Sequence, residues 1–141
     1  MTSFQIHNKY GKLILRKAAG TAYTDSGESV CIYFNNSGIA KIDGTVGKNI
    51  AIEIESRVNK QIRGAILDLI LHKYPKKLLV LLPVHMSNPE TTINQCNFIM
   101  EQFLDVNDFR VVLLKGHGND YRLDVDPQIV KNALKELSFS S

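Results

Sequence analysis

Hydrophobic and polar positions in the first third of the chain change from a helical period to short alternating runs. Apolar residues over 3–19 recur at helical spacing and predict an amphipathic helix. The apolar runs 30–34 and 39–43 flank the turn-forming residues NNSG, so they predict two paired strands. The segment 44–49 is typical of a loop that leads into a third strand at Ile50. Together these elements predict an antiparallel meander of three strands.

The rest of the chain alternates helices with continuously apolar strands. We expect a helix from Asn59 that ends before Pro75, and then a buried strand over 77–84. Asn88-Pro89 opens the next helix, whose expected core stripe is Ile93, Cys96, Met100, Phe103 and Leu104. A buried strand over 109–115 and a helix opened by Asp126-Pro127 complete the chain. A helix that joins two strands of one sheet makes a right-handed crossover, so the two buried strands should be parallel. We therefore expect an α/β fold, a three-layer sandwich with a mixed central sheet, in one domain over residues 1–141.

Composition and charge narrow the class of protein. The chain has 141 residues, 44% of them hydrophobic, which is enough to bury a core. Seventeen Lys and Arg residues against fourteen Asp and Glu give a net charge of +3, which permits a polyanionic partner without requiring one. Cys31 and Cys96 lie in apolar runs far apart, so we expect reduced core cysteines and a cytoplasmic location. The longest apolar run, 78–84, is far too short to span a bilayer, so we expect no membrane partner.

The strand that opens at residue 50 carries glutamates at alternate positions. Side chains alternate between the two faces of a strand, so Glu53, Glu55 and Arg57 share one face and the isoleucines share the other. The commoner interpretation is a solvated face whose charges pair among themselves. Asp43, at the end of the preceding strand, could reach the same place. Two ionised carboxylates about 6 Å apart repel by roughly 2.8 kcal/mol at an effective dielectric constant of about 20, so the group needs a cation.

Arg57 is one candidate for that cation, and a bound Mg²⁺ or Mn²⁺ is the other. Spacing alone favours the arginine, with Asp43 as the Asp of an Asp-Gly turn. The order of the motifs favours the metal, because Ile42-Asp43 is followed after nine residues by Glu53-Ile54-Glu55, and then by a helix and a buried strand. This arrangement, over residues 3 to about 115, resembles the PD-(D/E)XK nuclease superfamily, which includes many restriction endonucleases and Holliday junction resolvases.

The resemblance implies a restriction-endonuclease-like fold and a Mg²⁺-dependent endodeoxyribonuclease in which Mn²⁺ can substitute. Asp43, Glu53 and the backbone carbonyl of Ile54 would hold the metal. Glu55 occupies the position at which most members carry Lys, and it would accept a proton from the attacking water. Lys60, at the start of the next helix, is either a relocated lysine that neutralises charge on the phosphate or an ordinary solvated residue. The candidate catalytic residues are thus Asp43, Glu53, Glu55 and Lys60.

The expected partner of such a protein is DNA. Arg57, Lys60 and Arg63 lie close together in the chain and are candidates for contacts with phosphates, although each alone is more commonly part of a solvated face. A single domain of this length leaves little room for target recognition. We therefore expect a homodimer, or a complex with a larger subunit.

Two alternative functions remain open. A subunit with the same fold that has lost turnover would still bind DNA or assemble with a partner, and the glutamate in place of lysine supports it. A small-ligand pocket could instead form from the loops 85–90 and 115–120, which carry His85, Ser87, His117 and Asn119 after two buried strands. Ordinary turns are the plainer interpretation, because neither loop has a phosphate-binding glycine motif or metal-ligand spacing.

Overall fold

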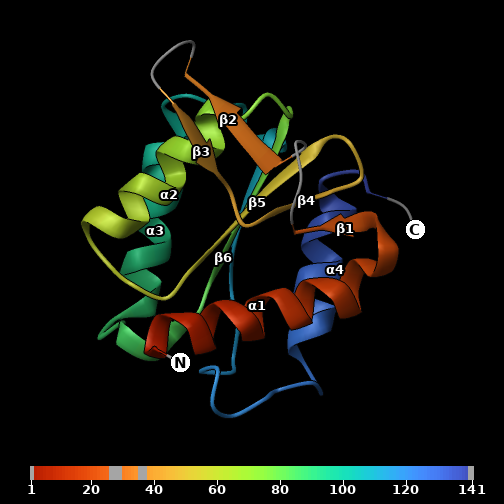
Figure 1. Cartoon of the computed structure of the whole chain (residues 1–141). Helices are drawn as coiled ribbons and strands as arrows, with labels where there is room; N and C mark the ends of the chain where they lie inside the picture. Colours follow the sequence, from red (N-terminus) through yellow and green to blue (C-terminus); the bar gives the residue numbers. More distant parts are fainter. Residues whose placement is uncertain (1, 26–29, 35–37, 140–141) are drawn as a thin grey trace.

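The computed structural model describes residues 2–25, 30–34 and 38–139 and has an α/β architecture (Figure 1). Its helices and strands are α1 (Ser3–Ala19), β1 (Tyr23–Thr24), β2 (Cys31–Tyr33), β3 (Ile39–Lys41), β4 (Gly44–Val46), β5 (Ile50–Glu55), α2 (Lys60–Leu71), β6 (Lys76–Leu81), α3 (Pro89–Glu101), β7 (Phe109–Leu113) and α4 (Asp126–Glu136). None of these helices combines the length and the apolar character needed to cross a membrane.

A mixed sheet of five strands forms the centre, in the order β1-β4-β5-β6-β7. β4 is antiparallel to both of its neighbours, β1 and β5, whereas β5, β6 and β7 run parallel to one another. The crossover helices α2 and α3 connect the parallel strands in turn. The predicted parallel pairing of the two apolar strands is therefore confirmed, and so is the mixed central sheet.

Two of the predicted strands do not join this sheet. β2 and β3 pair with each other, Cys31 opposite Lys41, and form a separate two-stranded sheet. The expected meander is wrong in this respect, because β5 pairs with β4, inside the segment 44–49 that was expected to be a loop. All three residues of β4 are buried, whereas Ile39 of β3 is 63% exposed. Residues 35–37 of the predicted turn lie outside the described part of the chain.

The edge strand β1 was not predicted, because a strand of two residues is too short to show an alternating pattern. Tyr23 lies opposite Val46 of β4, and its hydroxyl donates a hydrogen bond to the backbone carbonyl of Asp43 at 2.8 Å. Gly44 makes this approach possible, because a Cβ atom there would lie 2.3 Å from the ring of Tyr23. Asp43 is thus fixed just before the first residue of β4.

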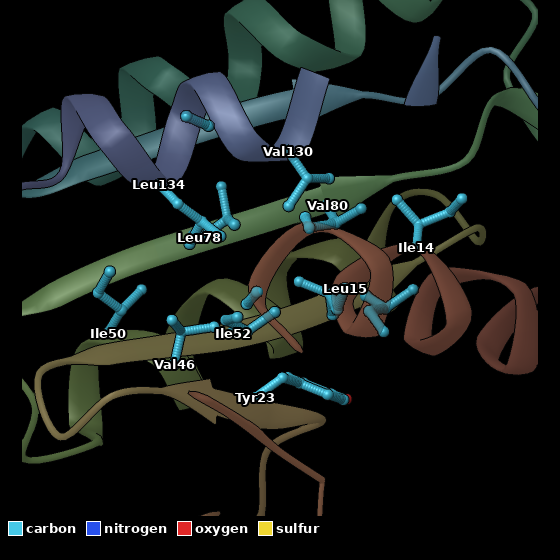
Figure 2. Packing of buried hydrophobic residues seen from close by; sticks show 14 of the residues in the cluster. Ile14, Leu15, Tyr23, Val46, Ile50, Ile52, Leu78, Val80, Val130 and Leu134 are labelled. Atoms are coloured by element: carbon cyan, nitrogen blue, oxygen red, sulfur yellow. The ribbon is translucent and has the colours of Figure 1, made fainter. Parts of the chain in front are cut away.

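Helices cover both faces of the sheet. α1 and α4 pack on one face, and α2 and α3 pack on the other (Figure 1). Figure 2 shows the first of these layers, where Leu15 of α1 and Leu134 of α4 meet Ile52 and Leu78 of the sheet. Full burial of such a side chain contributes about 1.5–3 kcal/mol to stability, so the helices are held mainly by these layers.

The helix starts are mostly those that the sequence predicts. α1 begins with a capping box between Thr2 and Gln5, and Asn88 caps α3 by accepting a hydrogen bond from the backbone of Thr91 at 3.2 Å. Asp126 differs, because it lies inside α4 and its buried carboxylate accepts hydrogen bonds from the backbone of residues 115 and 116. The expected core position of Phe103 is wrong, since this residue follows the end of α3 and is 66% exposed.

Candidate functional site: a buried carboxylate cluster

β5 lies in the middle of the sheet and is buried on both faces. Its isoleucines pack in the layer of α1 and α4, so by alternation Glu53 and Glu55 face the layer of α2 and α3. Glu53 is 9% exposed and Glu55 is 3% exposed. The expectation of a solvated face is therefore wrong for these two glutamates, because both are buried, although the expected pairing of charges does occur between Glu55 and Arg57.

Asp43 and Glu53 lie side by side at the carboxyl end of β5. The antiparallel register of β4 and β5 sets Gly44 opposite Ile52 and so brings the preceding residue, Asp43, next to Glu53. The backbone N–H of Asp43 donates to Oε1 of Glu53 at 2.9 Å, and the N–H of Ile54 donates to Oδ2 of Asp43 at 2.7 Å. The two expected metal-binding carboxylates are thus neighbours, and Ile54 is in contact with one of them.

Glu55 has a different environment. Its Oε2 accepts hydrogen bonds from the backbone N–H of Ser56 at 3.0 Å and of Arg57 at 2.9 Å, and from Nε of Arg57 at 3.0 Å. Its Oε1 accepts from Nη2 of Arg57, also at 3.0 Å. A bidentate guanidinium with two backbone donors compensates this charge fully. For Glu55, the expected arginine is therefore the cation.

The other carboxylates have no such partner. Within the described part of the chain neither Asp43 nor Glu53 forms an ion pair, and burial is the main cause that raises the pKa of both. The pKa of Glu53 rises to about 9, first through burial and then through the charges of Asp43 and Asp68. Burial also raises the pKa of Asp68. We call Asp43, Glu53, Glu55 and Asp68 the acidic cluster.

Two members of this environment were missed by the sequence analysis. Asp68 lies on α2 between the buried Ala65 and Leu69, at the border of the apolar stripe, and this position was the signal that could have revealed it. Lys12 of α1 is a cation whose charge lowers the pKa of Asp43. No local pattern identifies Lys12, because only the packing of α1 across β5 brings it near.

The three predicted DNA-contacting residues lie at the start of α2 and before it. Lys60 is the first residue of α2, and its side chain is exposed. Arg57 bridges to Glu55, and the exposed fraction of its side chain is 44%. Arg63 is exposed and lines a groove between α2 and α3. The structure thus brings Arg57 into direct contact with Glu55 of the acidic cluster. Lys60 and Arg63 follow Arg57 in the sequence, on the first turn of α2.

Asp43 and Glu53 have the donor chemistry that hard divalent cations take, since both are carboxylates. They are neighbours, and burial raises the pKa of each. Among the described residues, no group of three or more His, Cys, Asp or Glu side chains is arranged to hold a metal ion. Mg²⁺ is commonly held by one or two carboxylates, with waters and phosphate oxygens as its other ligands, so a site on Asp43 and Glu53 would need ligands from water or substrate.

Histidines gather at the same edge of the sheet, on the side of α1. Nδ1 of the buried His7 lies 3.0 Å from Oγ of Ser56, and its ring centre lies 5.5 Å from that of His85. Burial, and then the charges of His85 and His117, lower the pKa of His7. The loops 85–90 and 115–120 therefore do approach each other, around a histidine of α1 that sequence reasoning missed.

The other polar residues of the loops 85–90 and 115–120 have other surroundings than the contact between His7 and His85. Ser87 is exposed, and Asn119 lines a separate hollow of about 490 Å³ with Lys9 and Tyr121. His117 pairs with Asp120, with Nδ1 and Oδ1 3.4 Å apart. Hydroxyl partners on both ring nitrogens of His7, from Ser56 and from Ser3, make it a satisfied buried histidine rather than an open ligand site.

No family model matches the chain, and neither the curated proteins nor the solved structures contain a match.

Proposed function

We propose that the chain is a Mg²⁺-dependent endodeoxyribonuclease of the restriction-endonuclease-like kind, with Asp43 and Glu53 as its metal-binding residues. The observation that carries the proposal is that the backbone N–H of Asp43 donates to the buried Glu53 carboxylate, so the half-buried Asp43 and Glu53 are neighbours, and the pKa of each is raised, first by burial. Buried acids in such a state are typical of functional sites. Glu55, Asp68 and Lys12 complete the electrostatic environment.

The order of elements around the motifs supports the resemblance to PD-(D/E)XK nucleases. Glu53-Ile54-Glu55 closes β5, and α2 with the buried β6 follows, in the order of the family pattern. Asp43 differs from the expectation, because it lies just before β4 instead of ending a strand. The hairpin of β2 and β3 is then an insertion between β1 and β4. Burial of Glu53 and Glu55 within one central strand favours this assignment over a chance D…E-x-E match.

In this proposal each residue has a separate role. Asp43 and Glu53, with the carbonyl of Ile54 as a further ligand, would hold a divalent cation, which would supply an activated water and stabilise charge on the phosphate. Glu55 would accept a proton from the attacking water, but only after it releases Arg57. A substrate phosphate near Arg57 is the competing anion that draws the guanidinium away. Lys60 then contributes charge neutralisation at the phosphate.

The test is cleavage of supercoiled plasmid and of branched DNA in the presence of Mg²⁺, Mn²⁺ or EDTA. We expect cleavage that requires the metal and disappears in Glu53→Ala. Glu101→Ala is the matched control, because Glu101 is an exposed glutamate at the end of α3, away from the acidic cluster. Cleavage by Glu53→Ala at the wild-type rate would contradict the proposal.

A second candidate is a DNA-binding or assembly subunit without turnover. The observation that favours it is the bidentate contact of Arg57 with Glu55, which occupies the carboxylate where most family members have a free lysine. Such a subunit would retard DNA in a gel without metal and would not cleave it under any of these conditions. The same experiment therefore separates the two candidates.

A further inference from the structure

A groove of about 540 Å³ lies between the first half of α2 and α3. It starts next to the acidic cluster, because the chain runs directly from Glu55 through Arg57 to Val58 and Asn59, which line it. Four residues of extended chain span at most about 14 Å, so the groove begins within that distance of Glu55. A strand of nucleic acid whose phosphate lies at the acidic cluster would reach the groove within about four nucleotides, at 3.4 Å for each.

The lining of the groove combines three kinds of group. The residues are Val58, Asn59, Ile62, Arg63, Thr91, Thr92, Asn94, Gln95, Cys96, Phe98 and Ile99. Apolar side chains and the ring of Phe98 supply surface on which a flat ring can pack. Amide side chains, such as Asn94, supply both donors and acceptors, and Arg63 supplies a positive charge. No lining residue carries a negative charge, although the acidic cluster is close.

These groups match an unpaired nucleotide better than a base pair. A base outside the helix exposes its flat face for stacking on an aromatic ring, and its polar edge for hydrogen bonds to amides. In duplex DNA both the face and this edge are already occupied. An arginine beside the ring position suits the phosphate of the same nucleotide. The absence of acidic lining residues removes the repulsion that would exclude a polyanion.

We propose that this groove holds an unpaired nucleotide of the DNA strand that lies at the acidic cluster. The inference rests on the proposed function, and it names the substrate class: DNA with a flap, branch or mismatch near the scissile bond. Phe98 stacks on the base, and the amides of α3 bind its edge. Fully paired DNA lacks a nucleotide that can enter the groove.

The test measures binding in EDTA, so that it does not depend on cleavage. The probe is a duplex with a short single-stranded overhang that carries one 2-aminopurine, whose fluorescence changes on stacking. Phe98→Ala should weaken binding by about 5- to 150-fold, which is the usual effect of removing one base–aromatic stack. Phe103→Ala should bind like the wild type, because both rings are 66% exposed and only Phe98 lines the groove.

Further arms identify the occupant. A blunt duplex of the same sequence should bind to the wild type more weakly than the overhang does. Wild type and Phe98→Ala should bind this blunt duplex equally well. Free dAMP should compete poorly, because it lacks the strand that continues to the acidic cluster. Three results would each overturn the inference. The first is equal affinity of the wild type and Phe98→Ala for the overhang probe, and the second is equal affinity of the wild type for the blunt duplex and the overhang. The third is displacement of the probe by dAMP at a concentration similar to that of the unlabelled overhang duplex.

The outcome is separable from that of the proposed function. Overhang binding that depends on Phe98, with no metal-dependent cleavage of any DNA, would support the groove and reject the nuclease. Metal-dependent cleavage with equal rates on paired and branched DNA, and no effect of Phe98→Ala, would support the nuclease and reject the groove.

Discussion

Glu53 and Glu55 lie two residues apart on one face of β5, yet their charges are balanced in different ways. Four hydrogen bonds from Ser56 and Arg57 hold Glu55. Glu53 accepts one from the backbone of Asp43, and burial disfavours its ionised form. Glu53 therefore holds a proton at neutral pH.

The raised pKa of Glu53 makes stability depend on pH. Its folded-state pKa of about 9 lies above the ordinary value of 4.5, so the folded protein binds an extra proton between these values. Its contribution to the free energy of unfolding is fully present below the ordinary value and is lost as the pH rises through the folded-state value. The Tm measured in EDTA should therefore fall between about pH 5 and pH 9, and Glu53→Gln should flatten this dependence.

Mg²⁺ provides the complementary measurement on the same samples. It competes with the proton for Glu53, so it should raise the Tm more at about pH 9 than at about pH 6. Glu53→Gln should lose most of that difference. A Tm that rises with pH in EDTA would show that Glu53 is ionised in the folded protein. A Mg²⁺ effect on Tm that is the same in Glu53→Gln would show that Glu53 does not bind the metal.

Replacement of Glu55 by glutamine tests its role in proton transfer. Glu55→Gln keeps the shape of a buried side chain, and Arg57 stays hydrated because its side chain is half-exposed, so the fold should persist. Cleavage should fall by about 10²- to 10⁴-fold, the usual contribution of a general base. The readouts are the initial rate of plasmid nicking and the circular dichroism spectrum. A wild-type rate would remove Glu55 from the mechanism.

Elements with local signals were predictable, and elements defined by distant contacts were not. α2 and α3 follow from helical periodicity with Pro75 and Asn88 as boundaries, and β6 follows from its continuous apolar run. β4 has three residues and begins with Gly44, so only its neighbours β1 and β5 make it a strand. For the same reason the proximity of Asp43 to Glu53 could be predicted from the sequence, whereas that of Lys12 to Asp43 could not.

Gly11 shows how packing reverses a helix propensity. It lies inside α1, where alanine is intrinsically better by about 1 kcal/mol, yet a Cβ there would lie 2.6 Å from Cγ2 of Ile54. Gly11→Ala should therefore destabilise the protein, since overpacking costs about 1–3 kcal/mol. Gly64→Ala, in open space on α2, should stabilise it by about 0.5–1 kcal/mol. Urea denaturation of the two variants checks both signs, and stabilisation by Gly11→Ala would mean that α1 lies farther from β5.

At the scale of the whole molecule, the two faces of the sheet have different characters. The face under α2 and α3 carries the acidic cluster and the groove, whereas the face under α1 and α4 is an apolar layer (Figure 2). We propose that a second copy of the chain, or a larger subunit, supplies the remaining DNA contacts. Val106, past the end of α3, is 63% exposed and is available to such a partner.

The packing of α1 against α4 has a consequence for the order in which the protein folds during synthesis. The first helix made meets the last one, and the hydrogen bond from Tyr10 to Asp126 closes a separation of 116 residues. β5, α2, β6 and α3 follow one another along the chain, so their contacts are local and should form early. We expect the layer with the acidic cluster to assemble on the ribosome first. The other face of the sheet stays partly uncovered until α4 has been synthesised.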